Sequence, residues 1–346
     1  MKKHKYIQLA GSIIASINSG EYPVGAPLPG ERELAEKYQY SRQTVRKAID
    51  ILCGDNVLKR IHGSGNFVLR KTHRPKSGMV AVVSSHIALP HFSDTLLSMQ
   101  NTLTAGGFYP LCAVTNNRFD LERRVIEDLL CKNVDGLIVE GVLATIPNPN
   151  IQLYREIISQ DIPLVFINSY YKEINEAVYV SMDNVQGGEA CAKYLLSKGH
   201  TKFAGVFKAD DMESVQRYSG LARYASEQGL PLSDNNALWY TSTNLRKTLN
   251  DSALSCVGNC SAVVCFNDEV AFELYEVLRR SGMKNLERLE FVAFDRTAFS
   301  QRIPNKITLL DYPQQAIGKL AAQKIMNMIQ GKPESSQQLQ WQIFDE

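Results

Sequence analysis

Five polar side chains with strong hydrogen-bonding capacity lie close together near residue 45: Arg42, Gln43, Thr44, Arg46 and Lys47. Arginine and glutamine can each make paired hydrogen bonds to base edges in the major groove of DNA, and arginine and lysine also bind phosphates. On a helix, these positions would occupy the first two turns, so one N-terminal end would present them all to the same partner. The cluster therefore predicts a DNA-reading surface.

The residues between these donors predict the helix that would carry them. Val45, Ala48, Ile49 and Leu52 recur at intervals of three and four residues, which places them on one apolar face. Ser41 stands directly before the first donor and is a favourable N-cap residue. We therefore expect a helix after Ser41 whose inner face packs into a small domain and whose outer face stays in solvent.

Two more helices and a hairpin are expected around it. A first helix is predicted by four apolar residues at helical spacing: Ile7, Ala10, Ile14 and Ile17. Residues 31–38 predict a short second helix. Beyond the third helix, Val57–Ile61 and Asn66–Leu69 predict two short strands around a turn with two glycines at 62–65. Three short helices followed by a glycine-tipped hairpin predict a winged helix-turn-helix, an α+β fold.

Charge is divided unequally along the 346 residues. Residues 1–77 carry 14 Lys and Arg against 6 Asp and Glu, a net +8, whereas residues 78–346 carry 24 against 30, a net −6. A basic end suits a polyanionic partner, although basic stretches are also common on solvated surfaces. Charge alone therefore supports nucleic-acid binding without establishing it.

Three motifs follow one another in this region: Leu28-Pro-Gly-Glu-Arg-Glu-Leu-Ala35, Ser41-Arg-Gln-Thr-Val-Arg46 and His62-Gly-Ser-Gly-Asn-Phe-Val68. In order and spacing they resemble the DNA-binding domain of the GntR family, although Gly30 stands where that family commonly has a capping residue. The resemblance implies a set of residues that contact double-stranded operator DNA: Lys5, Tyr6, Arg32, Ser41, Arg42, Gln43, Thr44, Arg46, His62 and Gly63. Any one of the arginines alone could be an ordinary surface residue, but together in this frame they favour DNA contact.

A change of pattern separates the first seventy residues from the rest. Residues 70–78 have no apolar periodicity and contain Pro75, so we expect a DNA-binding domain at 1–70, a linker at 71–77 and a larger domain at 78–346. In the larger domain, stretches of helical length alternate with short apolar runs: Met79–Val83, Gly136–Val139, Pro163–Ile167, Phe203–Val206, Ala262–Phe266 and Leu289–Ala293. This alternation is typical of α/β folds with parallel sheets.

Five segments of the larger domain form a recognisable set: residues 178–200, Asp135–Val139, Arg217–Gly220, Ala262–Asp268 and Phe291–Asp295. Over residues 79–335 they resemble the effector-binding domain of LacI/GalR regulators, which is itself similar to periplasmic sugar-binding proteins. The resemblance implies a two-lobed periplasmic-binding-protein-like α/β domain. It also implies a small sugar as the effector, held in a cleft between the lobes.

The residues that line the sugar pocket in this family can be matched to individual positions of this sequence. The first candidates are Glu140, Asn168, Arg217, Asn267 and Asp295, and further candidates are Tyr312, His91 and Phe92. Carboxylates and amides can bind adjacent hydroxyls, arginine donates in a fixed fork, and an aromatic ring can cover the C–H face of a sugar. For Asn267 and Asp295, the alternative is that they cap the turn after a strand.

Three segments narrow the resemblance further: Thr115–Asn117, Glu122–Arg124 and Gly205–Asp211. They are similar to arabinose-responsive repressors of Gram-positive bacteria, which implies L-arabinose as the inducer and no cofactor. The resemblance also implies a homodimer on a palindromic operator, with surface helices at Phe92–Ala105 and Glu122–Leu130, and release of DNA when the sugar binds. The segment His73-Arg74-Pro75 stands where LacI-type proteins have a hinge helix.

Other functions find little support in the sequence. The nucleotide motifs G-x-x-x-x-G-K-[ST] and G-x-G-x-x-G after a strand are missing, as are G-x-S-x-G and H-E-x-x-H, so we expect no enzyme. A carbohydrate-active enzyme with a DNA-binding domain, an activator and a different effector sugar remain as alternatives. A transport receptor is disfavoured by the basic N-terminal region and by the absence of a signal-peptide pattern. The seven cysteines are scattered and favour packing over a metal site or disulfides, and no apolar stretch predicts a membrane span or a signal peptide. We therefore expect a cytoplasmic, nucleoid-associated protein.

Overall fold

The computed structural model describes residues 5–61, 64–69, 76–85, 90–312 and 314–345, with the backbone alone at 90–92, 314 and 345. Residues 5–69 belong to a small unit, called the head, and Gly78–Arg155 and residues from Pro163 onward form a larger one, called the body. The expected linker at 71–77 lies mostly outside the described residues, so the domain boundaries stay predictions. In the part of the chain that the structure describes, no helix is both long and apolar enough to cross a membrane.

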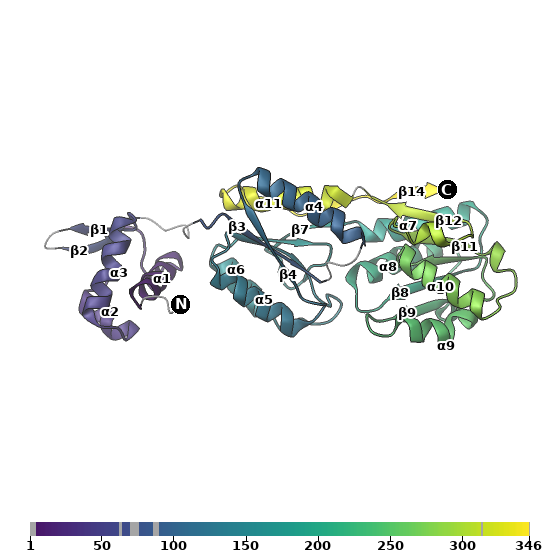
Figure 1. Cartoon of the computed structure of the whole chain (residues 1–346), viewed down its shortest axis with the longest axis horizontal. Helices are drawn as coiled ribbons and strands as arrows, with labels where there is room; N and C mark the ends of the chain where they lie inside the picture. Colours follow the sequence, from purple (N-terminus) through teal and green to yellow (C-terminus); the bar gives the residue numbers. More distant parts are fainter. Residues whose placement is uncertain (1–4, 62–63, 70–75, 86–89, 313, 346) are drawn as a thin grey trace. The chain divides into compact units, whose positions relative to one another are not determined.

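The head has the expected winged helix-turn-helix fold. Its elements are α1 (Lys5–Asn18), α2 (Glu31–Tyr38), α3 (Arg42–Gly54), β1 (Leu58–Ile61) and β2 (Gly65–Val68), and the two strands pair antiparallel (Figure 1). The predicted inner face of α3 is buried in full. Three short helices and a two-stranded wing enclose one small apolar core. Only the inner face of α3 packs into this core, so its outer face remains exposed to solvent.

The predicted apolar stripe of α1 was partly wrong. The buried residues are Leu9, Ala10, Ile13 and Ile17, whereas Ile7 is 44% exposed. Leu9, Ile13 and Ile17 are spaced by four residues and form a continuous row along the helix, which fills the core better than the row that begins at Ile7.

The first lobe of the body is a six-stranded parallel sheet with helices on both faces. The strands are β3 (Met79–Ser84), β4 (Tyr109–Val114), β5 (Gly136–Glu140), β6 (Leu164–Ile167), β7 (Val178–Met182) and β13 (Gln337–Leu339), in the order β13-β7-β6-β5-β3-β4. The helices α4 (Pro90–Ala105) and α11 (Gln314–Ile329) lie together over one face, and α5 (Phe119–Cys131) and α6 (Ile151–Ser159) lie over the other (Figure 1).

The second lobe repeats this architecture. Its strands are β8 (Phe203–Lys208), β9 (Ala237–Tyr240), β10 (Ala262–Cys265), β11 (Glu290–Phe294), β12 (Ile307–Asp311) and β14 (Gln342–Asp345), in the order β14-β12-β11-β10-β8-β9 with only β14 antiparallel. The helices are α7 (Asn184–Ser197), α8 (Met212–Glu227), α9 (Leu245–Val257) and α10 (Asp268–Arg280), with short 3₁₀ turns η1 (Asp234–Asn236), η2 (Leu286–Arg288) and η3 (Ser300–Arg302). The expected two-lobed α/β body is therefore confirmed.

Alternate residues of each central strand serve the two faces of the sheet. In β10, Ala262 and Val264 pack toward α7 and α8, whereas Val263 and Cys265 pack toward α9 and α10. Burial on both faces explains why these strands read as continuous apolar runs in the sequence. The chain crosses between the two sheets after β7, after β12 and after β13, so both sheets direct the carboxyl ends of their strands toward the space between the lobes.

Helices α7 and α8 approach each other closely because glycines face the contact. A Cβ atom at Gly220 would lie 2.0 Å from the carbonyl oxygen of Val185, and one at Gly188 would lie 2.0 Å from that of Arg217. Only hydrogen fits at either position.

Replacing Gly220 by alanine is therefore expected to destabilise the body by about 1–3 kcal/mol, the usual cost of overpacking. Gly11 in α1 is the matched control, because no atom lies within 4 Å of a Cβ placed there. Gly11→Ala should leave the head as stable as before, or more stable by about 0.5–1 kcal/mol. Chemical denaturation monitored by circular dichroism measures both, and equal stability of Gly220→Ala and the wild type would contradict this packing.

Candidate functional site

The outer face of α3 presents the donors that the sequence predicted. Arg42 and Gln43 are exposed in the first turn. Ser41 is the N-cap, because its hydroxyl accepts a hydrogen bond from the Thr44 backbone N–H at 3.2 Å and lies 2.9 Å from the Thr44 hydroxyl. Ser41 and Thr44 thus fix the start of the helix and leave Arg42 and Gln43 directed to solvent.

Two of the three predicted arginines form ion pairs in the head. Arg46 meets the Glu31 carboxylate through Nε at 3.1 Å and Nη2 at 2.8 Å, and this contact lowers the pKa of Glu31. The Arg46 side chain is still 66% exposed, so the pair joins the starts of α2 and α3 without covering the guanidinium. Arg32 pairs with Glu36 on α2 and is 75% exposed.

The remaining predicted DNA contacts lie at the edges of this face. Lys5 is exposed, whereas Tyr6 is half-buried against the head core with the Lys47 ammonium 5.9 Å from its ring. His62 and Gly63 lie outside the described residues. At the departure Gly30, no side chain caps α2, but the Gly30 backbone N–H donates to the Glu33 carboxylate at 3.0 Å, which is one of the two bonds of a capping box.

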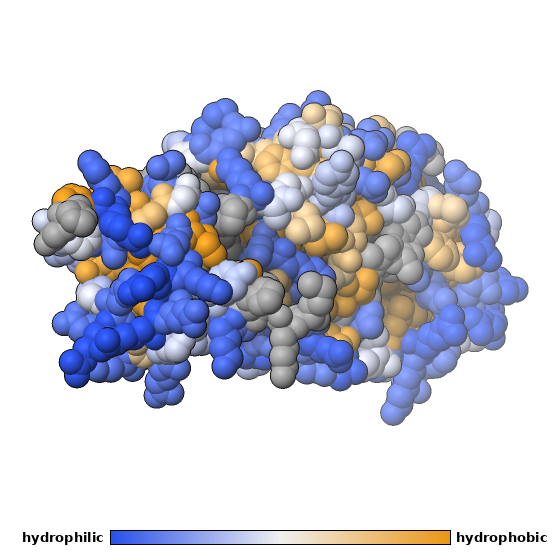
Figure 2. All heavy atoms as spheres, turned by 60° about the vertical axis from the view of Figure 1, so that its left-hand side comes forward, coloured by the Kyte–Doolittle hydropathy of each residue, from blue (hydrophilic) through white to orange (hydrophobic). Residues whose placement is uncertain are grey.

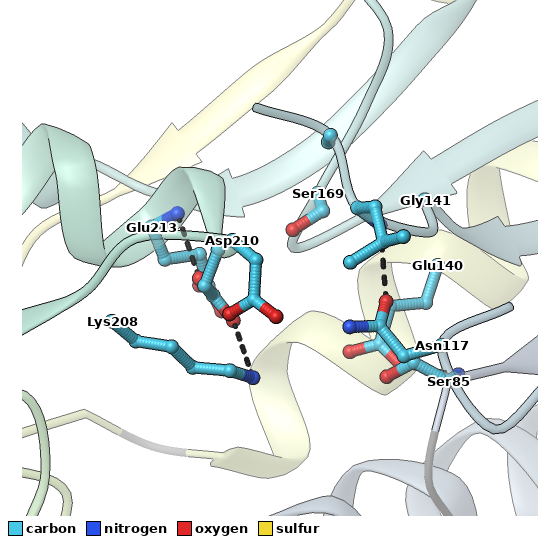
Figure 3. Close-up of a pocket in the computed structure, with 11 residues that line it drawn as sticks. Ser85, Asn117, Glu140, Gly141, Ser169, Lys208, Asp210 and Glu213 are labelled. Carbon is cyan, nitrogen blue, oxygen red and sulfur yellow. Dashed lines mark hydrogen bonds and ion pairs between the residues drawn. The ribbon is translucent and has the colours of Figure 1, made fainter. Parts of the chain in front are cut away.

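The body has a polar pocket between its two lobes. From the first lobe it is lined by Ser85, Asn117, Glu140, Gly141, Leu143, Ala144 and Ser169, and from the second by Lys208, Asp210, Asp211 and Glu213. All of these residues stand at or just beyond the carboxyl end of a parallel strand. Figure 3 shows Lys208, Asp210 and Glu213 on one side and Ser85, Asn117 and Glu140 on the other. We call this pocket the cleft.

Glu140 is held firmly at the end of β5. Its Oε2 accepts hydrogen bonds from the Ser84 hydroxyl at 2.9 Å and from the Ser85 backbone and hydroxyl at 2.7 and 2.6 Å. Its Oε1 accepts from the Asn168 amide at 3.2 Å. The predicted pair Glu140 and Asn168 is thus brought together, with Glu140 lining the cleft and Asn168 orienting it from β6.

A chain of contacts joins the lobes at the edge of the cleft. The Asn117 amide donates to the Ser242 hydroxyl at 3.3 Å, and the Ser242 backbone N–H donates to Asp210 at 2.9 Å. Within the second lobe, the Lys208 ammonium lies 3.5 Å from the Asp211 carboxylate. Burial opposes the charge on Lys208, but Asp211 and Asp210 outweigh it and raise the lysine pKa. Lys208 is therefore a fixed cation facing several carboxylates.

Glu213 is the most perturbed acid of the cleft. Burial raises its pKa to about 8, and the nearby carboxylates of Asp211, Asp295 and Glu140 add to the rise, although Arg217 opposes it. The distance from the Glu213 carboxylate to the Arg217 guanidinium is 4.0 Å. Glu213 is therefore protonated over much of the neutral pH range and can donate as well as accept a hydrogen bond.

Arg217 lies behind the cleft lining. Its guanidinium is 3% exposed and donates to Asn184 at 3.0 Å and to the Phe266 carbonyl at 2.6 Å. Three rings surround it, with the centroids of Phe294, Trp341 and Phe266 at 4.3, 4.8 and 4.9 Å. The structure thus gives Arg217 a position beside the crossings between the lobes, from which it reaches the cleft through Glu213.

Asn267, Asp295 and Tyr312 also lie outside the described cleft lining. Asn267 caps α10 by accepting from the Val270 N–H at 2.9 Å, the contact expected of a strand-end cap. Asp295 is buried with a left-handed backbone, φ 67°, and Tyr312 packs edge-on against Trp341 at 4.9 Å. The side chains of His91 and Phe92 are not among those described. None of these placements tests ligand contact, which stays a prediction for all of them.

Four polar residues of the second lobe were missed as site residues: Lys208, Asp210, Asp211 and Glu213. A signal was present for three of them, because Lys208, Asp210 and Asp211 follow the predicted strand Phe203–Val206 and belong to a segment that carried the resemblance. Polar residues directly after a buried parallel strand belong to the edge where ligands bind. Applied to every strand of the body, this rule would have found these three.

Comparison with known proteins agrees with this architecture. The model of the gntR family of bacterial regulatory proteins matches residues 5–68, and the model of the periplasmic binding protein-like domain matches residues 192–342. An arabinose metabolism transcriptional repressor of Halalkalibacterium halodurans is 31% identical over 94% of this chain and 89% of its own length. The chain belongs to the GntR family of bacterial regulators.

Another relative and two solved structures are also similar to this chain. A repressor of the same description from Geobacillus stearothermophilus is 31% identical over 94% of this chain and 91% of its own length. Among solved structures, the complex of the transcriptional regulator CelR with cellobiose has a TM-score of 0.68 at 17% identity, covering 92% of this chain and 98% of that one. The transcription regulator CcpA of Lactococcus lactis has a TM-score of 0.67 at 19% identity, covering 77% and 97%. These structures support the fold.

Arg42→Ala and Arg46→Ala are each expected to weaken DNA binding by about 1–3 kcal/mol, the usual value of a paired arginine–guanine contact. The measurement is fluorescence anisotropy with a DNA duplex that the wild-type chain selects from a random library. Arg279→Ala, which removes an exposed arginine from α10, is the charge-matched control and should bind like the wild type. Native affinity in both head variants would refute the proposed role of α3.

Glu213→Gln is expected to change how stability depends on pH. The pKa of Glu213 is raised in the folded state, so the folded chain binds more protons than the unfolded chain between about pH 4.5 and pH 8. The contribution of Glu213 to the free energy of unfolding is therefore fully present below pH 4.5 and is lost as the pH rises to 8. The glutamine variant should lack this loss and be more stable than the wild type above pH 8.

Thermal unfolding of the full chain across pH 5–9 measures the difference. Glu227→Gln makes the same chemical change at the exposed end of the same helix and should follow the wild-type curve. If the profiles of Glu213→Gln and the wild type run parallel, Glu213 does not hold a proton in the cleft.

Proposed function

We propose that this chain is a sequence-specific DNA-binding repressor of sugar-utilisation genes, and that L-arabinose in the cleft releases it from operator DNA. The observation that carries the proposal is the identity of 31% with two arabinose metabolism repressors, which extends over 94% of the chain and so includes both head and body. The head supplies the DNA-reading surface and the body supplies the sensor.

The chemistry of the cleft supports an uncharged polyhydroxyl ligand. Among the described residues, its lining carries the carboxyl groups of Glu140, Asp210, Asp211 and Glu213 against the ammonium of Lys208. A phosphorylated or acidic sugar would add negative charge to this set, whereas hydroxyl groups donate to carboxylates without charge. A neutral sugar is therefore the ligand class that the lining fits best.

A homodimer is part of the proposal, because a palindromic operator needs one head per half-site. On the first lobe, Leu97 of α4 is 54% exposed and Tyr109 of the edge strand β4 is 71% exposed. The apolar residues Ile126 and Leu129 of α5 instead point into the core. We therefore assign the dimer contact to α4 and β4. Figure 2 shows hydrophobic residues interspersed with hydrophilic ones on the side of the molecule that it presents, and it does not mark the proposed contact.

The proposal is tested by titrating the protein–DNA complex with sugars. L-arabinose should weaken binding to the selected duplex by about 5–150-fold, the usual range of an allosteric coupling. D-xylose, D-glucose and D-arabinose 5-phosphate are the comparison ligands. If one of these sugars and not L-arabinose released the DNA, that sugar would be the effector. If no sugar released the DNA, the sensor role would be refuted. If chromatography showed that the protein converts the added sugar into a product, the protein would be an enzyme instead.

Transcription in vitro from a promoter that carries the selected duplex distinguishes a repressor from an activator. The protein should lower the transcript level, and L-arabinose should restore it. A rise in transcript on addition of protein alone would show activation.

A further inference from the structure

One fully buried carboxylate lies close to the cleft without lining it. Glu122 of α5 is 0% exposed. Its oxygens accept hydrogen bonds from four uncharged donors: the Asn148 amide at 2.9 Å, the Asn150 amide at 2.7 Å, the Tyr154 hydroxyl at 2.7 Å and the Tyr171 hydroxyl at 2.6 Å. Burying a carboxylate is costly, and four donors offset that cost only in a fixed arrangement.

The donors connect this carboxylate to both ends of one irregular segment. Residues 141–150 contain no helix or strand, and Gly141, Leu143 and Ala144 within them line the cleft. Asn148 and Asn150 stand at the far end of the segment. At the near end, the Val142 backbone N–H donates to the Tyr171 hydroxyl at 2.6 Å, and that hydroxyl donates to Glu122. Glu122 thus contacts the far end of the segment directly and its near end through the Tyr171 hydroxyl.

The backbone at the cleft end needs such support. Leu143 has a left-handed conformation, φ 43°, which costs a non-glycine residue of order 1 kcal/mol or more and persists only where neighbouring contacts enforce it. The contact next to it is Val142 with Tyr171, and its own N–H donates to the Asn117 side chain at 3.0 Å. The strained residue is therefore held at its own N–H and at the N–H of the residue before it.

The direction of these hydrogen bonds is fixed by protonation. Burial and the adjacent Glu122 raise the pKa of Tyr154 and of Tyr171 far above the ordinary tyrosine value. Both phenols keep their protons, and Tyr154 donates its proton to Glu122. The single Tyr171 proton has two acceptors in reach, and the Glu122 carboxylate at 2.6 Å is closer than the Val142 carbonyl at 3.1 Å. With this proton directed to Glu122, the Tyr171 oxygen accepts from the Val142 N–H.

We propose that Glu122, acting through the Tyr171 hydroxyl, is a positioning residue for the cleft: it fixes the backbone of residues 141–143 in the strained conformation that ligand binding requires. The inference rests on the proposed sugar-binding role of the cleft. Its structural part, the fixing of residues 141–143, can be measured without any ligand.

Two matched variants separate positioning from simple stabilisation. Tyr171→Phe removes the hydroxyl that contacts both Glu122 and Val142. Tyr154→Phe removes a hydroxyl that donates to the same Glu122 oxygen, but among the described residues it has no hydrogen bond to the backbone of 141–143. Both rings belong to one cluster with Phe166, at centroid distances of 5.3–5.5 Å, so phenylalanine preserves the packing in each case.

The first measurement is hydrogen exchange of the full-length chain, read from peptides that cover residues 141–150. Exchange should be several-fold faster in Tyr171→Phe than in Tyr154→Phe and the wild type, because the Val142 N–H loses its acceptor. Equal exchange in all three proteins overturns the inference, whatever the chain binds.

The second measurement is calorimetric titration of the same proteins with L-arabinose. Tyr171→Phe should bind about tenfold more weakly than the wild type, which corresponds to about one hydrogen bond, and Tyr154→Phe should stay within about threefold. Equal losses in both variants would show general stabilisation of the lobe and overturn the positioning role. If the wild type itself binds no L-arabinose, the proposed effector fails, while the exchange result still decides whether Glu122 fixes the segment.

Discussion

The cleft is governed by the cost of gathering carboxyl groups away from bulk water. Glu140, Asp210, Asp211 and Glu213 line one small space, and Lys208 is the cation that faces them among the residues whose placement is described. Each carboxylate needs hydrogen-bond donors to offset lost hydration. Glu140 obtains them from Ser84, Ser85 and Asn168. Burial instead raises the pKa of Glu213 to about 8, so this group keeps its proton below that pH. The remaining acceptor capacity faces the open space, which explains why a neutral molecule rich in hydroxyl groups suits it.

The fold supplies this arrangement through two sheets whose strand ends meet. Because both sheets are parallel in their central strands, every loop that follows a strand reaches the same side of its lobe. The three crossings let the two sides face each other, and contacts such as Asn117 with Ser242 link them directly. A change in the separation of the lobes would therefore alter contacts on both sides of the cleft at once.

The sequence predicted the head more completely than the cleft. The apolar spacing of α3 and its Ser41 cap are local features, and a helix that needs one buried face leaves the other exposed, so Arg42 and Gln43 could be placed without knowing the rest of the chain. The cleft depends on contacts between distant segments. Glu140 was predicted through resemblance, but the position of Arg217 behind Glu213, among Phe266, Phe294 and Trp341, follows from how four separate segments pack. Local spacing contains no information about that packing.

The central claim is that the cleft and the DNA-reading face are coupled, and thermodynamic linkage gives it a direct test. If L-arabinose weakens DNA binding, DNA must weaken L-arabinose binding by the same factor. The decisive measurement is the affinity of the full-length protein for L-arabinose, determined once without DNA and once with saturating duplex. The account predicts weaker binding in the presence of DNA, by about 5–150-fold. Equal affinity in the two titrations would contradict it.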